Sequence, residues 1–123
     1  MRKNFILALA IGYTVALTIA SLINIKKLPS VGLSFEDKVY HFLAYLVLAI
    51  VWIKALEARK IKGYMLKAFL PVLIYGIIIE VIQQKLNPMR TYDTYDLIAN
   101  CLGVVVGTFI AIKLTKSKVK IKS

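Results

Sequence analysis

The sequence contains a single cysteine, Cys101, so an intrachain disulfide is excluded. Acidic residues are also scarce, with six Asp and Glu against 17 Lys and Arg, which gives a formal net charge of +11. There is no P-loop, no H-E-x-x-H metalloprotease motif and no G-x-S-x-G nucleophile motif. A strongly basic chain often binds nucleic acid, but no fold motif of such a protein is present. We therefore expect no nucleic-acid partner.

Hydrophobic residues make up 59% of the chain, and the mean hydropathy is +0.74. A helix needs about 20 apolar residues to cross the hydrocarbon core of a bilayer. Few structures other than helices satisfy their backbone groups in lipid. The sequence has four runs that are predominantly apolar, at 4–25, 39–53, 65–86 and 97–112. It therefore predicts an all-α fold, a polytopic membrane protein built as a four-transmembrane-helix bundle.

Lys and Arg are distributed unevenly between the two sides of such a bundle. With the N-terminus in the cytoplasm, 12 of the 17 fall on the cytoplasmic side and five on the outer side. Cytoplasmic loops carry an excess of Lys and Arg, so this bias predicts that both termini are cytoplasmic. Residues 1–114 then form the transmembrane domain, and residues 115–123 form a basic cytoplasmic tail.

The first apolar run has a second interpretation as a secretory signal peptide. It follows a basic start at Arg2 and Lys3, and Ala20 and Ser21 supply the small residues of a cleavage site. The run is long for a signal peptide, which favours a spanning helix. Cleavage would not change the orientation of the remaining helices.

Polar residues inside and beside the apolar runs gather on the predicted outer side. Residues three or four apart share a helix face, and three such sets occur: Asp37, His41 and Tyr45; Gly76, Glu80 and Gln83; Asp93, Asp96, Asn100, Gly103 and Gly107. Glu80 lies about 9 Å from the outer end of its helix at 1.5 Å per residue. A carboxylate facing lipid there would be costly, so Glu80 should face the bundle interior, with His41 or Arg90 as its partner. The set is either a functional site or a polar network that only fixes the packing of the helices.

Two stretches of the chain resemble the VanZ-like membrane protein family. The first is D-K-V-Y-H-F-L-A-Y at 37–45, and the second combines E-V-I-Q at 80–83, P-M-R at 88–90 and D-T-Y-D at 93–96 with Asn100, Gly103 and Gly107. The resemblance is strongest over 33–107, and Met89 departs from it, because the family often has Gly there. It implies a four-helix domain in a bacterial cytoplasmic membrane. It also implies a link to teicoplanin, because the family's namesake is associated with low-level resistance to this lipid-tailed glycopeptide, which acts outside the cell.

Two functions remain open. The first is recognition of an anionic lipid-linked or envelope-related head group at the outer face, which would affect teicoplanin susceptibility. The predicted ligand-binding residues are Asp37, Lys38, His41, Tyr45, Glu80, Gln83, Arg90, Asp93, Asp96 and Asn100. Arg90 can pair with a phosphate through two parallel hydrogen bonds. The alternative is a membrane-embedded enzyme that acts on a lipid-linked phosphate or envelope precursor, with His41, Glu80 and Asp96 as acid and base candidates.

No cofactor and no metal site are expected. Asp93, Asp96 and Glu80 supply oxygen ligands that suit Mg²⁺ or Ca²⁺, but no dedicated metal motif is present. The expected partners are membrane lipids and a lipid-linked envelope precursor or glycopeptide. A proton-coupled transporter is less favoured, because its charged groups should extend across the depth of the membrane. The sequence does not determine the oligomeric state.

Overall fold

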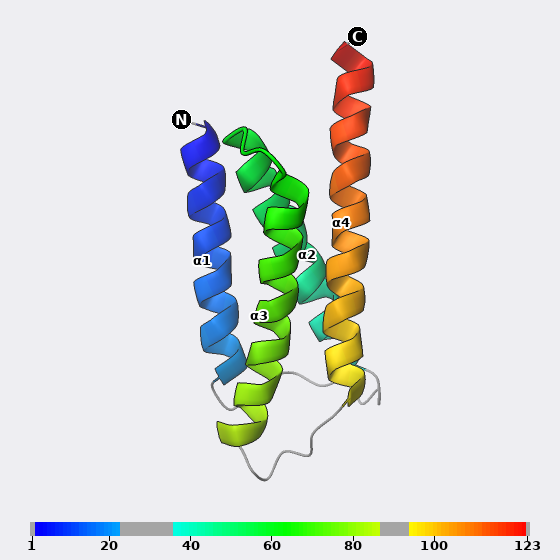
Figure 1. Ribbon diagram of the computed structural model, residues 1–123. Helices are drawn as coiled ribbons and strands as arrows, with labels where there is room; N and C mark the ends of the chain where they lie inside the picture. Colours follow the sequence, from blue (N-terminus) through cyan, green and yellow to red (C-terminus); the bar gives the residue numbers. More distant parts are fainter. Residues whose placement is uncertain (1, 23–35, 87–93, 123) are drawn as a thin grey trace.

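The structure is a computed structural model that describes residues 2–22, 36–86 and 94–122, and these form four α-helices (Figure 1). The helices are α1 (Arg2–Leu22), α2 (Glu36–Ala58), α3 (Tyr64–Leu86) and α4 (Thr94–Lys122). They run alternately up and down, so that Arg2 and Lys122 lie at the same end of the bundle. We call this the terminal end. The opposite end, where Leu22, Glu36, Leu86 and Thr94 lie, is the distal end.

Each helix is long and apolar enough to cross a bilayer, and the described residues contain no strand. The predicted fold class is therefore confirmed. The helices extend beyond the apolar runs at most of their ends, because Lys and Glu are good helix formers and helical hydrogen bonding does not stop where hydrophobicity stops. α4 continues to Lys122, through most of the segment predicted to be a tail. That the tail is a separate unit stays a prediction.

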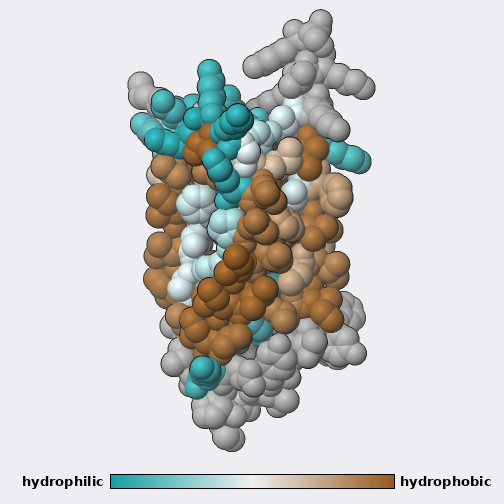
Figure 2. All heavy atoms as spheres, in the orientation of Figure 1, coloured by the Kyte–Doolittle hydropathy of each residue, from teal (hydrophilic) through white to brown (hydrophobic). Residues whose placement is uncertain are grey.

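The distribution of side chains suits a lipid environment. Many of the buried side chains are small, whereas many large apolar side chains point outwards. Phe5, Leu66 and Phe109 are each more than 60% exposed. Figure 2 shows an apolar band around the middle of the visible face and hydrophilic residues gathered at the terminal end. Lipid provides no hydrophobic driving force between helices, so close contact of small residues holds them together. The buried alanines are Ala10, Ala49, Ala55, Ala68, Ala99 and Ala111.

α2 and α4 form the most extensive helix pair, and two glycines make this contact possible. A Cβ atom at Gly103 would collide with the backbone oxygen of Phe42, and one at Gly107 would collide with that of Leu46. Gly103 and Gly107 form a G-x-x-x-G pair, a pattern that lets helix backbones approach closely in membranes. Asn100 lies one turn before Gly103 on α4. The close approach at the two glycines therefore also brings Asn100 against α2.

α1 and α4 lie on opposite sides of the α2–α3 pair (Figure 1). α1 is held by hydrogen bonds that its hydroxyl side chains donate or accept. The Tyr13 hydroxyl donates to the Ala44 carbonyl oxygen at 2.7 Å, and the Trp52 indole Nε1 donates to Thr14 Oγ1 at 2.8 Å. These bonds give α1 fixed positions on α2 although few of its residues are buried.

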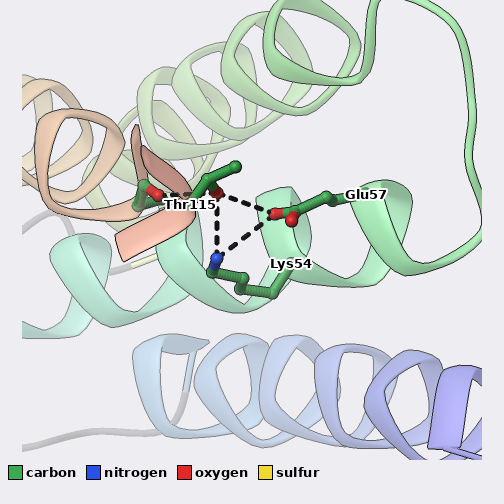
Figure 3. Close-up of polar contacts among 4 residues, drawn as sticks. Lys54, Glu57 and Thr115 are labelled. Atoms are coloured by element: carbon green, nitrogen blue, oxygen red, sulfur yellow. Dashed lines mark hydrogen bonds and ion pairs between the residues drawn. The ribbon is translucent and has the colours of Figure 1, made fainter. Parts of the chain in front are cut away.

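At the terminal end, a polar cluster joins α2 to α4 (Figure 3). Lys54 Nζ donates to Glu57 Oε2 at 3.2 Å and to Thr115 Oγ1 at 3.0 Å. Thr115 Oγ1 lies 3.0 Å from both Glu57 Oε2 and the Ala111 carbonyl oxygen, and its single proton serves one of them at a time. The cluster satisfies polar groups where α2 approaches the membrane surface.

Candidate functional site

Three helices each contribute one polar side chain to a single buried position near the distal end. His41 of α2, Glu80 of α3 and Asn100 of α4 lie five or six residues from the distal ends of their helices, about 8–9 Å at 1.5 Å per residue. Glu80 is 4% exposed and Asn100 is 2% exposed. The three residues, far apart in the sequence, therefore share one depth and meet inside the bundle. We call them the distal cluster.

The geometry of the distal cluster fixes the orientation of the His41 ring. His41 Nδ1 lies 2.9 Å from Asn100 Oδ1 and 4.0 Å from Glu80 Oε2. A carbonyl oxygen only accepts hydrogen bonds, so Nδ1 carries a proton and donates to Asn100. In the neutral ring this leaves Nε2 as an acceptor, and in the protonated ring Nε2 becomes a second donor. Glu80 lies at ion-pair distance from the protonated form.

Tyr45 lies one turn deeper on the same face of α2 as His41, and its side chain is 2% exposed. Gly76 of α3 faces it: a Cβ atom at Gly76 would lie 3.0 Å from the Tyr45 ring and 3.6 Å from the Cβ atom of Asn100. Tyr45 and Asn100 therefore flank the same point on α3. Within the described residues, neither the Tyr45 hydroxyl nor Asn100 Nδ2 has a hydrogen-bond partner. One donor within the distal cluster and one beside it thus have no partner among the described residues.

Gln83, one turn beyond Glu80 on α3, connects the site to α1. Its Nε2 donates to the Ser21 carbonyl oxygen at 2.8 Å, and it is 5% exposed. In the part of the chain that the structure describes, Gln83 Oε1 has no hydrogen-bond partner. The sequence-based interpretation missed α1 altogether. Thr14, Thr18 and Ser21 recur at the spacing of one helix face, and this signal could have indicated a polar face on α1.

The remaining predicted site residues are placed only in part. Asp37 and Lys38 lie in the first turn of α2 and Asp96 lies in the first turn of α4, all at the distal end, but their side chains lie outside the described structure. Arg90 and Asp93 lie outside the described residues. Whether these five residues join the distal cluster stays a prediction.

Metal ligands can be assessed only for the described part of the chain. There, no group of three or more His, Cys, Asp or Glu side chains could hold a metal ion. The cation site considered from the sequence needs Asp93, which lies outside the described residues, and the Asp96 side chain, which lies outside the described structure, so it stays a prediction. What the distal cluster offers chemically is a fixed imidazole, a buried carboxylate and hydrogen-bond donors.

The family model VanZ/LLP1 matches residues 9–116 of the chain. Comparisons with curated proteins and with solved structures gave no match. The family match includes the whole of α2 and α3, most of α1 and α4, and both stretches on which the resemblance rests. The chain therefore belongs to the VanZ-like family.

Proposed function

We propose that the distal cluster recognises an anionic lipid-linked or envelope-related head group at the outer face of a bacterial cytoplasmic membrane, and that this recognition affects teicoplanin susceptibility. The observation that carries the proposal is the pair of buried donors, Tyr45 Oη and Asn100 Nδ2, that lack partners within the described residues. A buried polar group without a partner costs about 1–3 kcal/mol, so a ligand that supplies acceptors would recover this energy. Phosphate and carboxylate oxygens are such acceptors.

The depth of the site supports a lipid-linked ligand. The distal cluster lies about 8–9 Å from the helix ends and Tyr45 about 14 Å from the start of α2, so the head group would enter the bundle from the distal end. The lipid tail of such a ligand would remain beside the apolar outer surface of the bundle. Teicoplanin has a lipid tail and acts outside the cell, so it meets the same requirements as a lipid-linked envelope precursor. VanZ-like family membership gives the link to this antibiotic.

One observation favours catalysis as the second candidate function. Asn100 holds the proton on His41 Nδ1, which in the neutral ring leaves Nε2 free to act as a base, and Glu80 at 4.0 Å would stabilise the protonated ring. The substrate would be the same lipid-linked phosphate or envelope precursor. Incubation of purified protein with a polyprenyl phosphate, followed by mass spectrometry of the lipid, separates the two: recognition alone leaves the lipid unchanged, and catalysis yields a product.

The orientation of the bundle is part of this proposal. The exposed cations at the terminal end, which include Arg59, Lys60, Lys62, Lys67 and Lys113, support a cytoplasmic location of that end. In a Cys101→Ala background, cysteines introduced at Ser30 and Asn87 should react from outside whole cells with an impermeant maleimide. A cysteine at Lys60 should react only after the membrane is permeabilised. The opposite labelling pattern would put the distal cluster on the cytoplasmic side and contradict the proposal.

Direct binding tests the ligand class. In detergent, the full chain should bind a polyprenyl phosphate at least tenfold more tightly than the uncharged polyprenol, as measured by microscale thermophoresis. Arg90→Lys should weaken binding of the phosphate about tenfold, because it keeps the charge but loses one of two parallel hydrogen bonds. Lys85→Arg is the matched control, since Lys85 is an exposed cation at the same end, and it should bind normally. Equal affinity for the two lipids would contradict recognition of an anionic group.

A further inference from the structure

A cavity of about 380 Å³ lies between α1, α2 and α3, and no residue of the distal cluster lines it. Its volume is within the range of about 300–1,000 Å³ that ligand pockets in proteins occupy. Along α3 it extends from Lys67 to Tyr75, about 12 Å at 1.5 Å per residue. Lys67 lies three residues from the start of α3, so the cavity begins near the terminal end and continues into the apolar middle of the bundle.

The wall of this cavity is suited to an apolar occupant. Leu48, Leu56 and Val72 line it together with polar side chains whose hydrogen bonds are already made within the protein. Trp52 Nε1 donates to Thr14 Oγ1 at 2.8 Å. The Thr14 hydroxyl in turn donates to the Ala10 carbonyl oxygen at 2.8 Å. The hydroxyl of Tyr75, another wall residue, is bonded to Thr18 Oγ1 at 2.5 Å. An apolar chain in the cavity would therefore leave none of these bonds broken.

The entrance of the cavity is positively charged. Lys67 lines the cavity and is exposed, and it lies within one turn of the start of α3. A Lys at that depth can extend its ammonium group to the level of the lipid head groups. Arg59, Lys60 and Lys62, which are all exposed, belong to or adjoin the short α2–α3 connection at the same end. Their charges favour an anionic group at this entrance over a zwitterionic one.

We propose that the cavity binds one anionic phospholipid from the leaflet at the terminal end. One acyl chain occupies the space between Trp52 and Pro71, and the head-group phosphate pairs with Lys67. A phospholipid is the occupant that fits these features, because the surrounding bilayer supplies it, its chain matches the wall and its charge matches the entrance. The head-group end of this second site lies at the terminal end, no residue of the distal cluster lines the cavity, and the proposal does not depend on the function proposed for that cluster.

Trp52 is the only tryptophan in the chain and lines the cavity, so its fluorescence reports occupancy directly. The full chain is reconstituted in phosphatidylcholine vesicles that contain the same series of mole fractions of either brominated phosphatidylglycerol or brominated phosphatidylcholine. Bromine on an acyl chain in contact with the indole quenches its emission. We expect the anionic lipid to quench at several-fold lower mole fraction than the zwitterionic lipid.

Lys67→Gln should lower this preference about fivefold, since one cation near a membrane surface contributes about 1 kcal/mol. Lys67→Arg keeps the charge and should retain the preference. Lys113→Gln removes an exposed cation of α4 that does not line the cavity and should also retain it. Equal quenching by the two lipids in the unmodified protein would overturn the proposal. A preference that survives Lys67→Gln, or that falls equally in Lys113→Gln, would show general attraction to the basic surface and would also overturn it.

Discussion

Gly103→Ala should lower the stability of the bundle by about 3 kcal/mol, the upper part of the usual range for overpacking a tight contact. The new Cβ atom would collide with the backbone oxygen of Phe42 and lie 3.1 Å from the backbone nitrogen of Leu46. Backbone atoms cannot move aside as a flexible side chain can, so α2 and α4 must separate along their whole contact. Thermal unfolding in detergent, followed by circular dichroism, should show a melting temperature lower by about 10 °C.

Gly12→Ala is the matched control for this change. It makes the same substitution within a helix, but nothing lies within 4 Å of a Cβ atom at Gly12. Alanine favours a helix over glycine by about 0.8–1.0 kcal/mol in water, so this variant should be as stable as the unmodified protein or more so. If Gly103→Ala unfolds at the same temperature as Gly12→Ala, the close packing of α2 on α4 is not what holds the distal cluster together.

Much of the fold could be predicted because the hydrocarbon core of a bilayer imposes simple requirements on the length, the apolar character and the backbone hydrogen bonding of the segments that cross it. Four apolar runs of sufficient length in a chain of 123 residues leave little alternative to four helices. The inward orientation of Glu80 followed from the cost of exposing a carboxylate to lipid, and the structure places it 4% exposed. The spacing of His41 and Tyr45 placed them on one face of α2, and both face the bundle interior.

Which groups pair with one another could not be predicted. The sequence left His41 and Arg90 as partners of Glu80, and in the structure His41 does lie at ion-pair distance from Glu80, 4.0 Å, but its closer partner is Asn100, which the sequence did not indicate. Helix periodicity fixes the face of a residue but not the rotation and height of the facing helix, so spacing cannot rank two nearby acceptors. Gly103 and Gly107 likewise indicated a close helix contact without identifying α2 as the partner helix.

The contribution of α1 was missed for a related reason. A threonine in a helix can bond to the carbonyl oxygen four residues earlier, as Thr14 and Thr18 both do. Such a residue needs no partner on another helix, so a polar face of α1 does not by itself predict which helix it contacts. Only the structure shows that Thr18 also bonds to Tyr75 and that Ser21 accepts from Gln83 through its backbone oxygen.

Tyr45→Phe should bind a polyprenyl phosphate at least tenfold more weakly while melting at a higher temperature. The change removes a buried hydroxyl that has no partner within the described residues, which should raise the stability of the ligand-free protein by about 1 kcal/mol or more. It leaves the apolar volume of the ring in place against Gly76. Residues that serve binding are often suboptimal for stability, so this opposite response is the expected mark of a binding site.

The most direct test of the distal cluster as a ligand site is therefore a paired measurement on one preparation of Tyr45→Phe. The melting temperature of the ligand-free protein and the dissociation constant for polyprenyl phosphate are determined beside those of the unmodified chain. We predict a melting temperature raised by a few degrees together with an affinity reduced at least tenfold. A lower melting temperature with unchanged affinity for the folded protein would show that Tyr45 only supports the packing of the helices, and would contradict the proposed site.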